Sequence, residues 1–205
     1  DPELSRGLGD VYKRQAQNAG HVRIFKYQVI SGTATWTQLG ADIDGEAAND
    51  QSGYSVSLSD DGTKVAIGAR NNDGANGVDS GHVRIYNYNG TAWTQLGDDI
   101  DGEAANDLSG HSVSLSADGT KVAIGAIHND ETASNAGHVR IYNYNGTAWT
   151  QLGADIDGEA YNNAANDFSG HSVSLSADGT KVAIGAPKNQ ASGNPVSYTH
   201  LTLPT

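Results

Sequence analysis

The sequence predicts an all-β protein made of β-propeller blades, each a four-stranded antiparallel sheet. Two observations predict this fold. One segment recurs three times, and within it large and small side chains alternate with a period of two. The three copies span residues 51–70, 108–127 and 168–187. A third observation is one tryptophan per repeat, because Trp36, Trp93 and Trp149 each begin the sequence Trp-Thr-Gln-Leu-Gly.

Each copy predicts two strands joined by a tight turn. In the middle copy, His111–Ser116 alternates serine with valine and leucine, and Lys121–Ala126 alternates valine and isoleucine with alanine and glycine. Asp118–Gly119 between them is typical of a short hairpin loop, because glycine readily adopts a positive φ. We name these strands a and b.

Two further strands, c and d, complete the unit. His138–Tyr144 alternates in the same way, and Ala148–Leu152 follows it after an Asn145–Gly146 turn. No segment has helical periodicity. The units differ in length where loops are expected, at residues 29–32 in the first hairpin and at an insertion, residues 161–164.

The two faces of these strands predict how the units pack. On strands a and b, one face carries branched and bulky side chains, whereas the other consists of serine, alanine and glycine. A large face fits a small face at close approach, as in a stack of propeller blades. In chain order there are a c–d pair, two complete units and an a–b pair, about three blades' worth, whereas closed propellers have roughly 4–8 blades. We expect an open fragment of a larger ring, with both end faces exposed.

The repeat region is predicted to span residues 16–195. Asp1–Gln15 and Val196–Thr205 match nothing in the repeats, and both resemble translated sequencing-adapter runs at the ends of assembled metagenomic reads. We therefore expect both tails to be non-native and leave them out of the fold.

Composition excludes several classes of function. The net charge of −12 over 205 residues disfavours nucleic acid and anionic lipid as partners, because both require a basic surface. The absence of cysteine excludes disulfides, thiolate metal sites and cysteine nucleophiles. No apolar run reaches the roughly 18 residues of a membrane span, so we expect no membrane insertion.

The segment Phe168–Pro187 resembles an FG-GAP repeat, the blade unit of integrin-α-like propellers. It has an aromatic residue near Gly170, an alternating strand, a turn, and Val-Ala-Ile followed by Gly185-Ala186-Pro187. The resemblance implies a seven-bladed extracellular propeller that binds proteins or glycans. Blades of that family often hold calcium in an Asp-rich loop, but the turn at residues 116–120 is too short and has too few carboxylates for it.

An acidic box, Asp-Ile-Asp-Gly-Glu, begins at Asp42, Asp99 and Asp155. A cation site would use Asp101 and Glu103, with the intervening glycine letting the backbone approach the ion. The alternative is a connector between blades, in which Asp and Asn side chains bond nearby backbone N–H groups. These side chains include the Asn-Asp pair at residues 106–107. We expect the connector, and calcium remains the alternative.

The repeated His, Trp and Ser side chains are interpreted as packing groups. His82 and His138 lie on the polar side of strand c, each two residues before an arginine, Arg84 or Arg140. At the start of strand a, the residues in the three copies are Tyr54, His111 and His171. Tyrosine in place of histidine favours packing over zinc binding. Each tryptophan is expected to be an anchor with a bonded indole N–H rather than a sugar platform. The repeated Ser-x-Ser-x-Ser of strand a lacks the Gly-x-Ser-x-Gly turn that exposes a nucleophilic serine, so we expect these serines to pack between blades.

We therefore expect no catalytic, cofactor-binding or metal-binding residue, and no enzyme. The segments that differ most between units are the b–c loops at Asn71–Asp79, His128–Asn135 and Lys188–Gly193. Variable loops on a rigid scaffold usually hold binding specificity. The predicted function is a non-enzymatic module at the cell surface that binds a protein or glycan through its b–c and d–a loops. The alternatives are a fragment of a propeller polysaccharide hydrolase or lyase whose catalytic blade is missing, and a purely structural repeat array.

Overall fold

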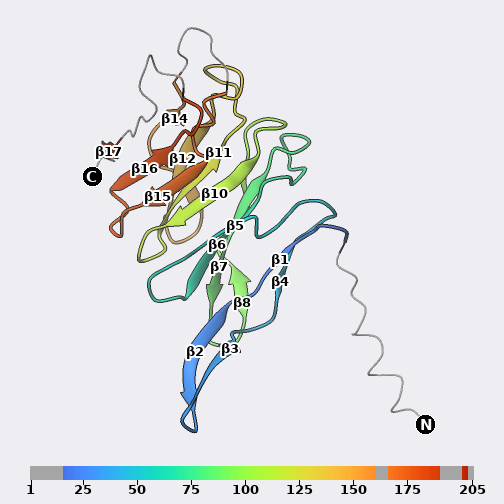
Figure 1. Cartoon of the computed structure of the whole chain (residues 1–205), viewed down its shortest axis with the longest axis vertical. Helices are drawn as coiled ribbons and strands as arrows, with labels where there is room; N and C mark the ends of the chain where they lie inside the picture. Colours follow the sequence, from blue (N-terminus) through green and yellow to red (C-terminus); the bar gives the residue numbers. More distant parts are fainter. Residues whose placement is uncertain (1–15, 160–165, 190–199, 203–205) are drawn as a thin grey trace, which may run out of the picture.

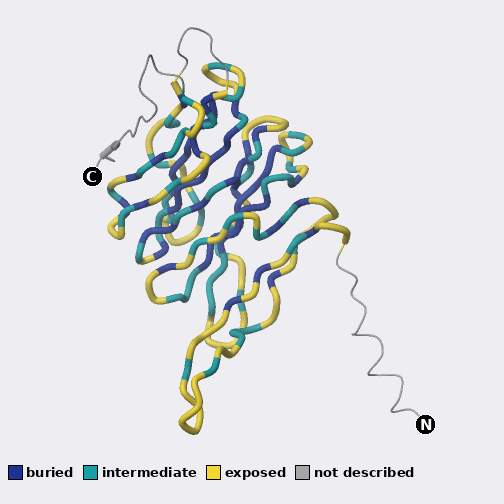
Figure 2. The backbone as a smooth tube through the Cα atoms, in the orientation of Figure 1, coloured by how far each residue is buried: buried dark blue, intermediate teal, exposed yellow. Residues whose placement is uncertain are grey.

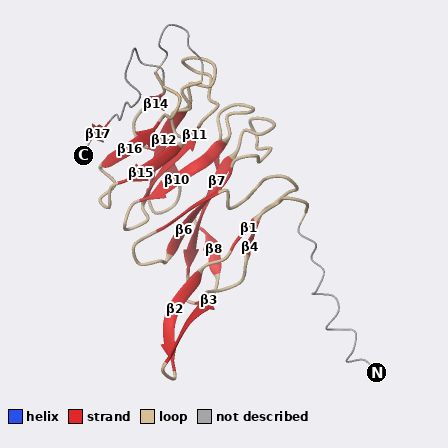
Figure 3. Cartoon of the chain, in the orientation of Figure 1, coloured by secondary structure: helices blue, strands red, loops and turns tan. Residues whose placement is uncertain are grey.

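The computed structural model describes residues 16–159, 166–189 and 200–202, and every regular element in these ranges is a β-strand (Figure 3). The strands form consecutive antiparallel sheets that lie side by side in an open arc (Figure 1). Within the described ranges there is no helix long and apolar enough to cross a membrane. The predicted fold, an open fragment of β-propeller blades, is confirmed.

The first sheet element is half a blade, equivalent to strands c and d. Its strands are β1 (His21–Val22), β2 (Phe25–Ile30), β3 (Thr33–Gln38) and β4 (Ile43–Asp44). β1 pairs with β4, and β2 pairs with β3. The extra residues at 29–32, predicted to lie in the first hairpin, do lengthen it, and the hairpin closes on Ser31 and Gly32 with positive φ values of 52° and 81°. Two consecutive positive φ values are typical of a type I′ turn, whose twist matches that of the strands.

Two complete blades follow. The second blade contains β5 (Ser55–Leu58), β6 (Lys64–Ala69), β7 (His82–Tyr88), β8 (Trp93–Gln95) and β9 (Ile100–Asp101). The third contains β10 (Ser109–Leu115), β11 (Lys121–Ala126), β12 (His138–Tyr144), β13 (Trp149–Gln151) and β14 (Ile156–Asp157). In each, the first four strands pair in chain order as a, b, c and d, and the short fifth strand pairs with strand c beyond the end of strand d.

The last sheet begins with β15 (Ser172–Leu175) and β16 (Lys181–Gly185). A third strand, β17 (His200–Thr202), pairs with β16 where the other blades place strand c. This strand lies in the tail that was predicted to be non-native. Residues 1–15, the insertion at 161–164 and the remainder of that tail lie outside the described residues.

The predicted strand bounds differ from the observed ones in a few places. β11 and β12 have the predicted bounds, whereas β10 begins earlier, through an irregularity between Ser109 and Ser112, and β13 is shorter. The fifth strands were not predicted. They form because the second and third residues of each acidic box extend along strand c, as in the pairing of His138 with Asp157 and of Val139 with Ile156. A two-residue strand is too short for a period-two pattern to reveal.

The core lies between blades, where a large face packs on a small face as predicted. Between the second and third blades, Ala66, Val83 and Ile85 from one side meet Val122 and Ile124 from the other, and all five are at most 1% exposed. Similar clusters occupy the junctions before and after it. Blade-to-blade burial of apolar surface is therefore the main stabilising contribution.

One glycine in each strand b permits this close approach. A Cβ on Gly68 would lie 2.1 Å from the carbonyl oxygen of Gly110 in the next blade, and a Cβ on Gly125 would lie 2.2 Å from that of Gly170. Any side chain here would push the blades apart.

The first strand a shows what happens where the preceding half-blade lacks strands a and b. Val56 and Leu58 on β5 are 53% and 50% exposed, whereas the equivalent Val113 and Leu115 on β10 are 8% and 7% exposed. The exposed stretches at this end of the arc are visible in Figure 2. The predicted exposure of the end face is confirmed.

Candidate functional site

The densest group of ionisable side chains lies at the junction between the second and third blades. We call it the junction cluster, and it consists of Glu103, Glu131, His138 and Asp155. Glu103 follows β9 of the second blade. The other three belong to the third blade, with His138 opening β12, Asp155 just before β14, and Glu131 in the loop between β11 and β12. One ligand atom from each of the four lies within 4.8 Å of those from the others.

His138 is the buried centre of the cluster. Its Nδ1 lies 3.7 Å from Glu103 Oε2 and 3.5 Å from Asp155 Oδ2, and the residue is 1% exposed. Nδ1 has no hydrogen-bond partner. Burial lowers the pKa of His138 from 6.5 to about 4, and nearby Arg140 lowers it further while Asp155 opposes the shift. The imidazole is therefore neutral at physiological pH.

Arg140 connects the same two blades. It donates from one terminal nitrogen to the carbonyl oxygen of Asp101, 2.8 Å away, and its other terminal nitrogen lies 3.2 Å from Glu103 Oε1. Burial raises the pKa of Glu103, with the nearby carboxylates of Asp155 and Glu131 adding to the shift and Arg140 opposing it. The pKa rises because burial of the carboxyl group outweighs the attraction of the Arg140 guanidinium.

The junction between the first and second blades repeats this arrangement. His82 Nδ1 lies 3.6 Å from Asp99 Oδ2 and 4.0 Å from Glu46 Oε2. Arg84 bonds the carbonyl oxygen of Asp44 at 3.1 Å and lies 3.1 Å from Glu46 Oε1. Burial lowers the pKa of His82 as well.

These contacts revise two interpretations of the sequence. The acidic box does connect blades, but through the guanidinium of the next strand c and not only through backbone N–H groups. The carboxylates that the alternative cation site would use, Asp101 and Glu103, do not belong to one cluster. Glu103 instead meets Asp155, the first residue of the following box, because β14 and β9 flank strand c from adjacent blades. His82 precedes Asp99 by 17 residues and His138 precedes Asp155 by 17, so this shared spacing in two repeats was the signal that the sequence offered.

The aspartate that follows each box has a structural role, because it pairs with an asparagine of the next b–c loop. Asp107 is 3% exposed, accepts from the Ala104 backbone N–H at 3.2 Å, and accepts from Asn129 Nδ2 at 3.1 Å. Asp50 and Asn72 make the same bond in the preceding blade, at 3.2 Å. Each pair therefore fixes a b–c loop against a d–a connection, as the connector interpretation predicts.

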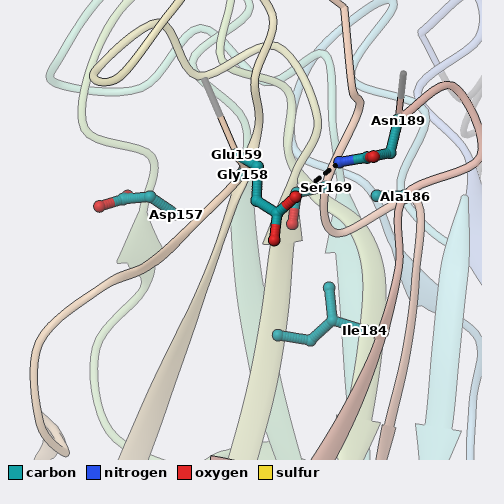
Figure 4. A pocket seen from close by; sticks show the side chains of 7 residues that line it. All are labelled: Asp157, Gly158, Glu159, Ser169, Ile184, Ala186 and Asn189. Atoms are coloured by element: carbon teal, nitrogen blue, oxygen red, sulfur yellow. Dashed lines mark hydrogen bonds between the residues drawn. The ribbon is translucent and has the colours of Figure 1, made fainter. Parts of the chain in front are cut away.

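The last blade has an open socket at the equivalent place (Figure 4). A pocket is lined by Asp157, Gly158, Glu159, Ser169, Ile184, Ala186 and Asn189. In the third blade the residues that pair with the equivalents of Ala186 and Ile184 are His138 and Arg140. Among the described residues of the last sheet no histidine or arginine takes those places, and Asn189 Nδ2 bonds Glu159 Oε2 at 3.3 Å instead.

The serine row of strand a fastens neighbouring blades. Ser55 Oγ donates to the carbonyl oxygen of Gly110 and Ser112 Oγ to that of Gly170, each at 2.7 Å. Ser57 Oγ accepts from the Leu115 backbone N–H at 2.9 Å. These hydroxyls are used in packing, as expected.

The tryptophans and strand-a rings also lie between blades. Trp93 Nε1 donates to Leu39 O at 2.8 Å, and Trp149 Nε1 donates to Leu96 O at 2.7 Å, so both are the expected anchors. Trp36 is 66% exposed, at the end of the arc. The rings of Tyr54, His111 and His171 form a column with centroids 5.1 Å apart at each step.

The b–c and d–a loops lie together at one end of the blades (Figure 1). Asn106 N donates to Val78 O at 2.8 Å, and the equivalent bond in the third blade joins Asn166 N to Ser134 O at 2.8 Å. The predicted binding loops are thus side by side in space. Of the loop at 188–193, only Lys188 and Asn189 are described.

Comparison with known proteins agrees with this architecture. The fold defines an arc of β-propeller blades. Residues 41–86 match the family model described as FG-GAP repeat, the family that another copy, Phe168–Pro187, resembles. No curated protein matches the chain.

Two solved structures are similar to the chain. A candidate 6-phosphogluconolactonase from Bacteroides uniformis is 12% identical with a TM-score of 0.51, over 88% of this chain and 49% of that one. At this identity the likeness shows the fold alone. The hydrazine synthase of Kuenenia stuttgartiensis is 14% identical with a TM-score of 0.45, over 80% of this chain and 43% of that one. The chain spans about half the length of these structures or less.

Proposed function

We propose that the protein is a non-enzymatic binding module of a cell-surface or extracellular protein, which contacts a protein or glycan through its b–c and d–a loops. The observation that carries this proposal is the position of those loops. They differ in sequence between blades, yet the fold places them together at one end of a rigid, repeated scaffold. The FG-GAP repeat at residues 41–86 supports a surface location, because such repeats are typical of surface proteins.

The repeated polar side chains favour binding over catalysis. An active site in a propeller requires groups that differ between blades and converge on one place. Here the strand-a serines, the tryptophan and the strand-c arginine of both complete blades contact a neighbouring blade. Their roles are therefore accounted for by packing.

The loops divide into a fixed part and a presented part. In the third blade, Asn129 is buried and bonded to Asp107, whereas Thr132 and Ser134 are exposed. In the second blade, Val78 is 60% exposed at the equivalent place. An exposed apolar side chain at a loop tip is a suitable contact for a partner.

A loop replacement tests the proposal. Immobilised extracellular-matrix proteins and polysaccharides would be screened by biolayer interferometry against the wild-type chain and a variant with Ala133, Ser134 and Val78 replaced by glycine. Thr132 stays, because its hydroxyl donates to the carbonyl oxygen of Gly158 at 3.1 Å. Asn129 stays, because replacing all of 128–135 would remove a buried hydrogen bond. Loss of a wild-type interaction with an unchanged melting temperature supports the proposal. Binding that survives the replacement contradicts it.

A reducing-end assay on the same polysaccharides, together with the binding results, separates the rival functions. Release of reducing ends from a polysaccharide, lost on changing a junction carboxylate, would indicate a hydrolase or lyase. An absence of any interaction across the panel would favour a purely structural array, which the near-identity of the repeats also fits. A full reading frame with one atypical blade rich in carboxylates or histidine would likewise favour the enzyme.

A further inference from the structure

We propose that the junction cluster binds a divalent first-row transition-metal ion, with zinc as the representative, through Glu103, Glu131, His138 and Asp155. The ion would join two neighbouring blades, because Glu103 comes from one blade and the other three ligands come from the next.

The first argument is the unpartnered nitrogen of a buried side chain. His138 is 1% exposed, its Nδ1 has no hydrogen-bond partner, and this atom faces carboxylate oxygens at 3.5 and 3.7 Å. These separations are too long for a hydrogen bond. They are close to the ~3.3 Å that separates two ligand atoms around a tetrahedral ion with bonds of about 2.0 Å.

The second argument is the orientation of the carboxylates. Glu103 presents Oε1 to Arg140 at 3.2 Å and Oε2 to His138. Asp155 accepts a hydrogen bond from Gln151 Nε2 on Oδ1 and presents Oδ2 to His138. In both, one oxygen is held by a protein donor while the other is directed to the same point. Metal-binding carboxylates are typically oriented in this way by outer partners.

The third argument is charge and donor type. Three carboxylates and one guanidinium leave two formal negative charges at the junction, which a divalent cation would neutralise. One imidazole with three carboxylates suits zinc, manganese or cobalt. Calcium requires about six to eight oxygen ligands, more than this cluster offers.

The preceding junction provides an internal comparison. Glu46, His82 and Asp99 repeat three of the four ligands, with the same outer partners, Arg84 and Gln95. Gly74 follows Asn72 by two residues, just as Glu131 follows Asn129, so the fourth carboxylate is missing there. We therefore expect a weaker site at this junction.

Isothermal titration calorimetry of the full chain with zinc chloride, after chelator treatment, tests the proposal. The wild type should show two classes of site. Glu131→Gly, which changes an exposed residue to the one found at the other junction, should weaken the tighter class by about tenfold or more. Asp99→Asn should weaken only the other class. Zinc should raise the melting temperature of the wild type, and this shift should shrink in the Glu131→Gly variant.

Several results would overturn the proposal. These are the absence of saturable zinc binding by the wild type, a tighter class unaffected by Glu131→Gly, and displacement of zinc by calcium at equal concentration. His171→Tyr is the control for the ring column of strand a. Loss of the tighter class in this variant would place the ion on His111 and His171 rather than at the junction, and would also refute the assignment.

Discussion

At the scale of single residues, glycine in strand b determines how closely two blades approach. Gly68 and Gly125 face a backbone carbonyl oxygen of the next blade, which cannot move aside without displacing a strand. Gly185 occupies the same position in the last sheet, but among the described residues the atoms nearest to an added Cβ belong to Ser172. The same residue type is therefore under different constraints in different blades.

A matched pair of alanine substitutions tests this difference. Gly125→Ala should lower the free energy of unfolding by ~1–3 kcal/mol, because the new methyl group overpacks against Gly170. Gly185→Ala should be milder, since its nearest atom is the rotatable Ser172 hydroxyl. Urea unfolding followed by tryptophan fluorescence measures both. Equal losses would mean that blade-to-blade approach is not the constraint.

A second residue-scale prediction concerns pH. Burial lowers the pKa of His111 from 6.5 to about 4, and His171, Arg70 and His128 add to the shift. Tyr54 also contacts the ring. The unfolded chain therefore binds a proton before the folded one does. The stabilising contribution of neutral His111 is complete above about pH 6.5 and is lost as the pH falls from there towards 4.

His111→Tyr, which introduces the residue found in the first copy, should flatten this dependence. We expect the variant to lose less stability than the wild type between pH 7.5 and 4.5, measured as urea midpoints at each pH. Some dependence should remain, because burial also lowers the pKa of His138 to about 4. An unchanged slope in the variant would refute the assignment to His111.

At the scale of elements, the unit of stability is a large face covered by the small face of the preceding blade. β5 and β10 have nearly the same sequence, yet their apolar residues differ in exposure by tens of per cent, Leu58 being 50% and Leu115 7% exposed. A strand in this protein is therefore stabilised by its neighbour blade more than by its own sheet.

Substitution of the two leucines separates these contributions. Leu115→Ala should cost ~2–5 kcal/mol, as expected for a truncation in a packed core. Leu58→Ala should cost less than ~1 kcal/mol, because half of that side chain is already in water. Thermal and urea denaturation of both variants provide the measurement. Similar costs would show that the exposed face of β5 is covered in solution, for example by another copy.

At the scale of the whole molecule, the chain is an arc with two unsatisfied ends. One end exposes Val56, Leu58 and Trp36, and the other has the socket formed by Asp157 and Glu159 beside Ile184. In repeat proteins each added unit contributes its own stability and an interface, so completing an end should stabilise the whole.

Completion of the last blade tests this expectation. Residues 190–205 would be replaced by the protein's own 130–152 sequence, which supplies a loop and strands c and d. The added His and Arg should fill the socket as His138 and Arg140 fill theirs, and the melting temperature should rise by several degrees. The same extension with both residues changed to serine is the control. A rise that is equal in both would assign the gain to the added strands alone.

Much of this architecture could be predicted from the sequence. Period-two alternation located strands b and c. Successive side chains of a strand point to opposite faces, so two faces with different surroundings require alternating residue types. The contrast between Val122 or Ile124 and the small residues beside them predicted a stack of sheets. The once-per-repeat tryptophan predicted an anchor, since a buried indole N–H must find an acceptor.

The tertiary structure alone decided what meets across each junction. Glu103 and Asp155 belong to successive acidic boxes separated by a whole repeat, and only the packing of one blade on the next brings both to His138. Local patterns specify backbone conformation and the inward face, because those depend on near neighbours in the chain. The partners of a side chain between blades depend on how the sheets are placed relative to one another, and a sequence pattern of any one repeat does not contain that distance.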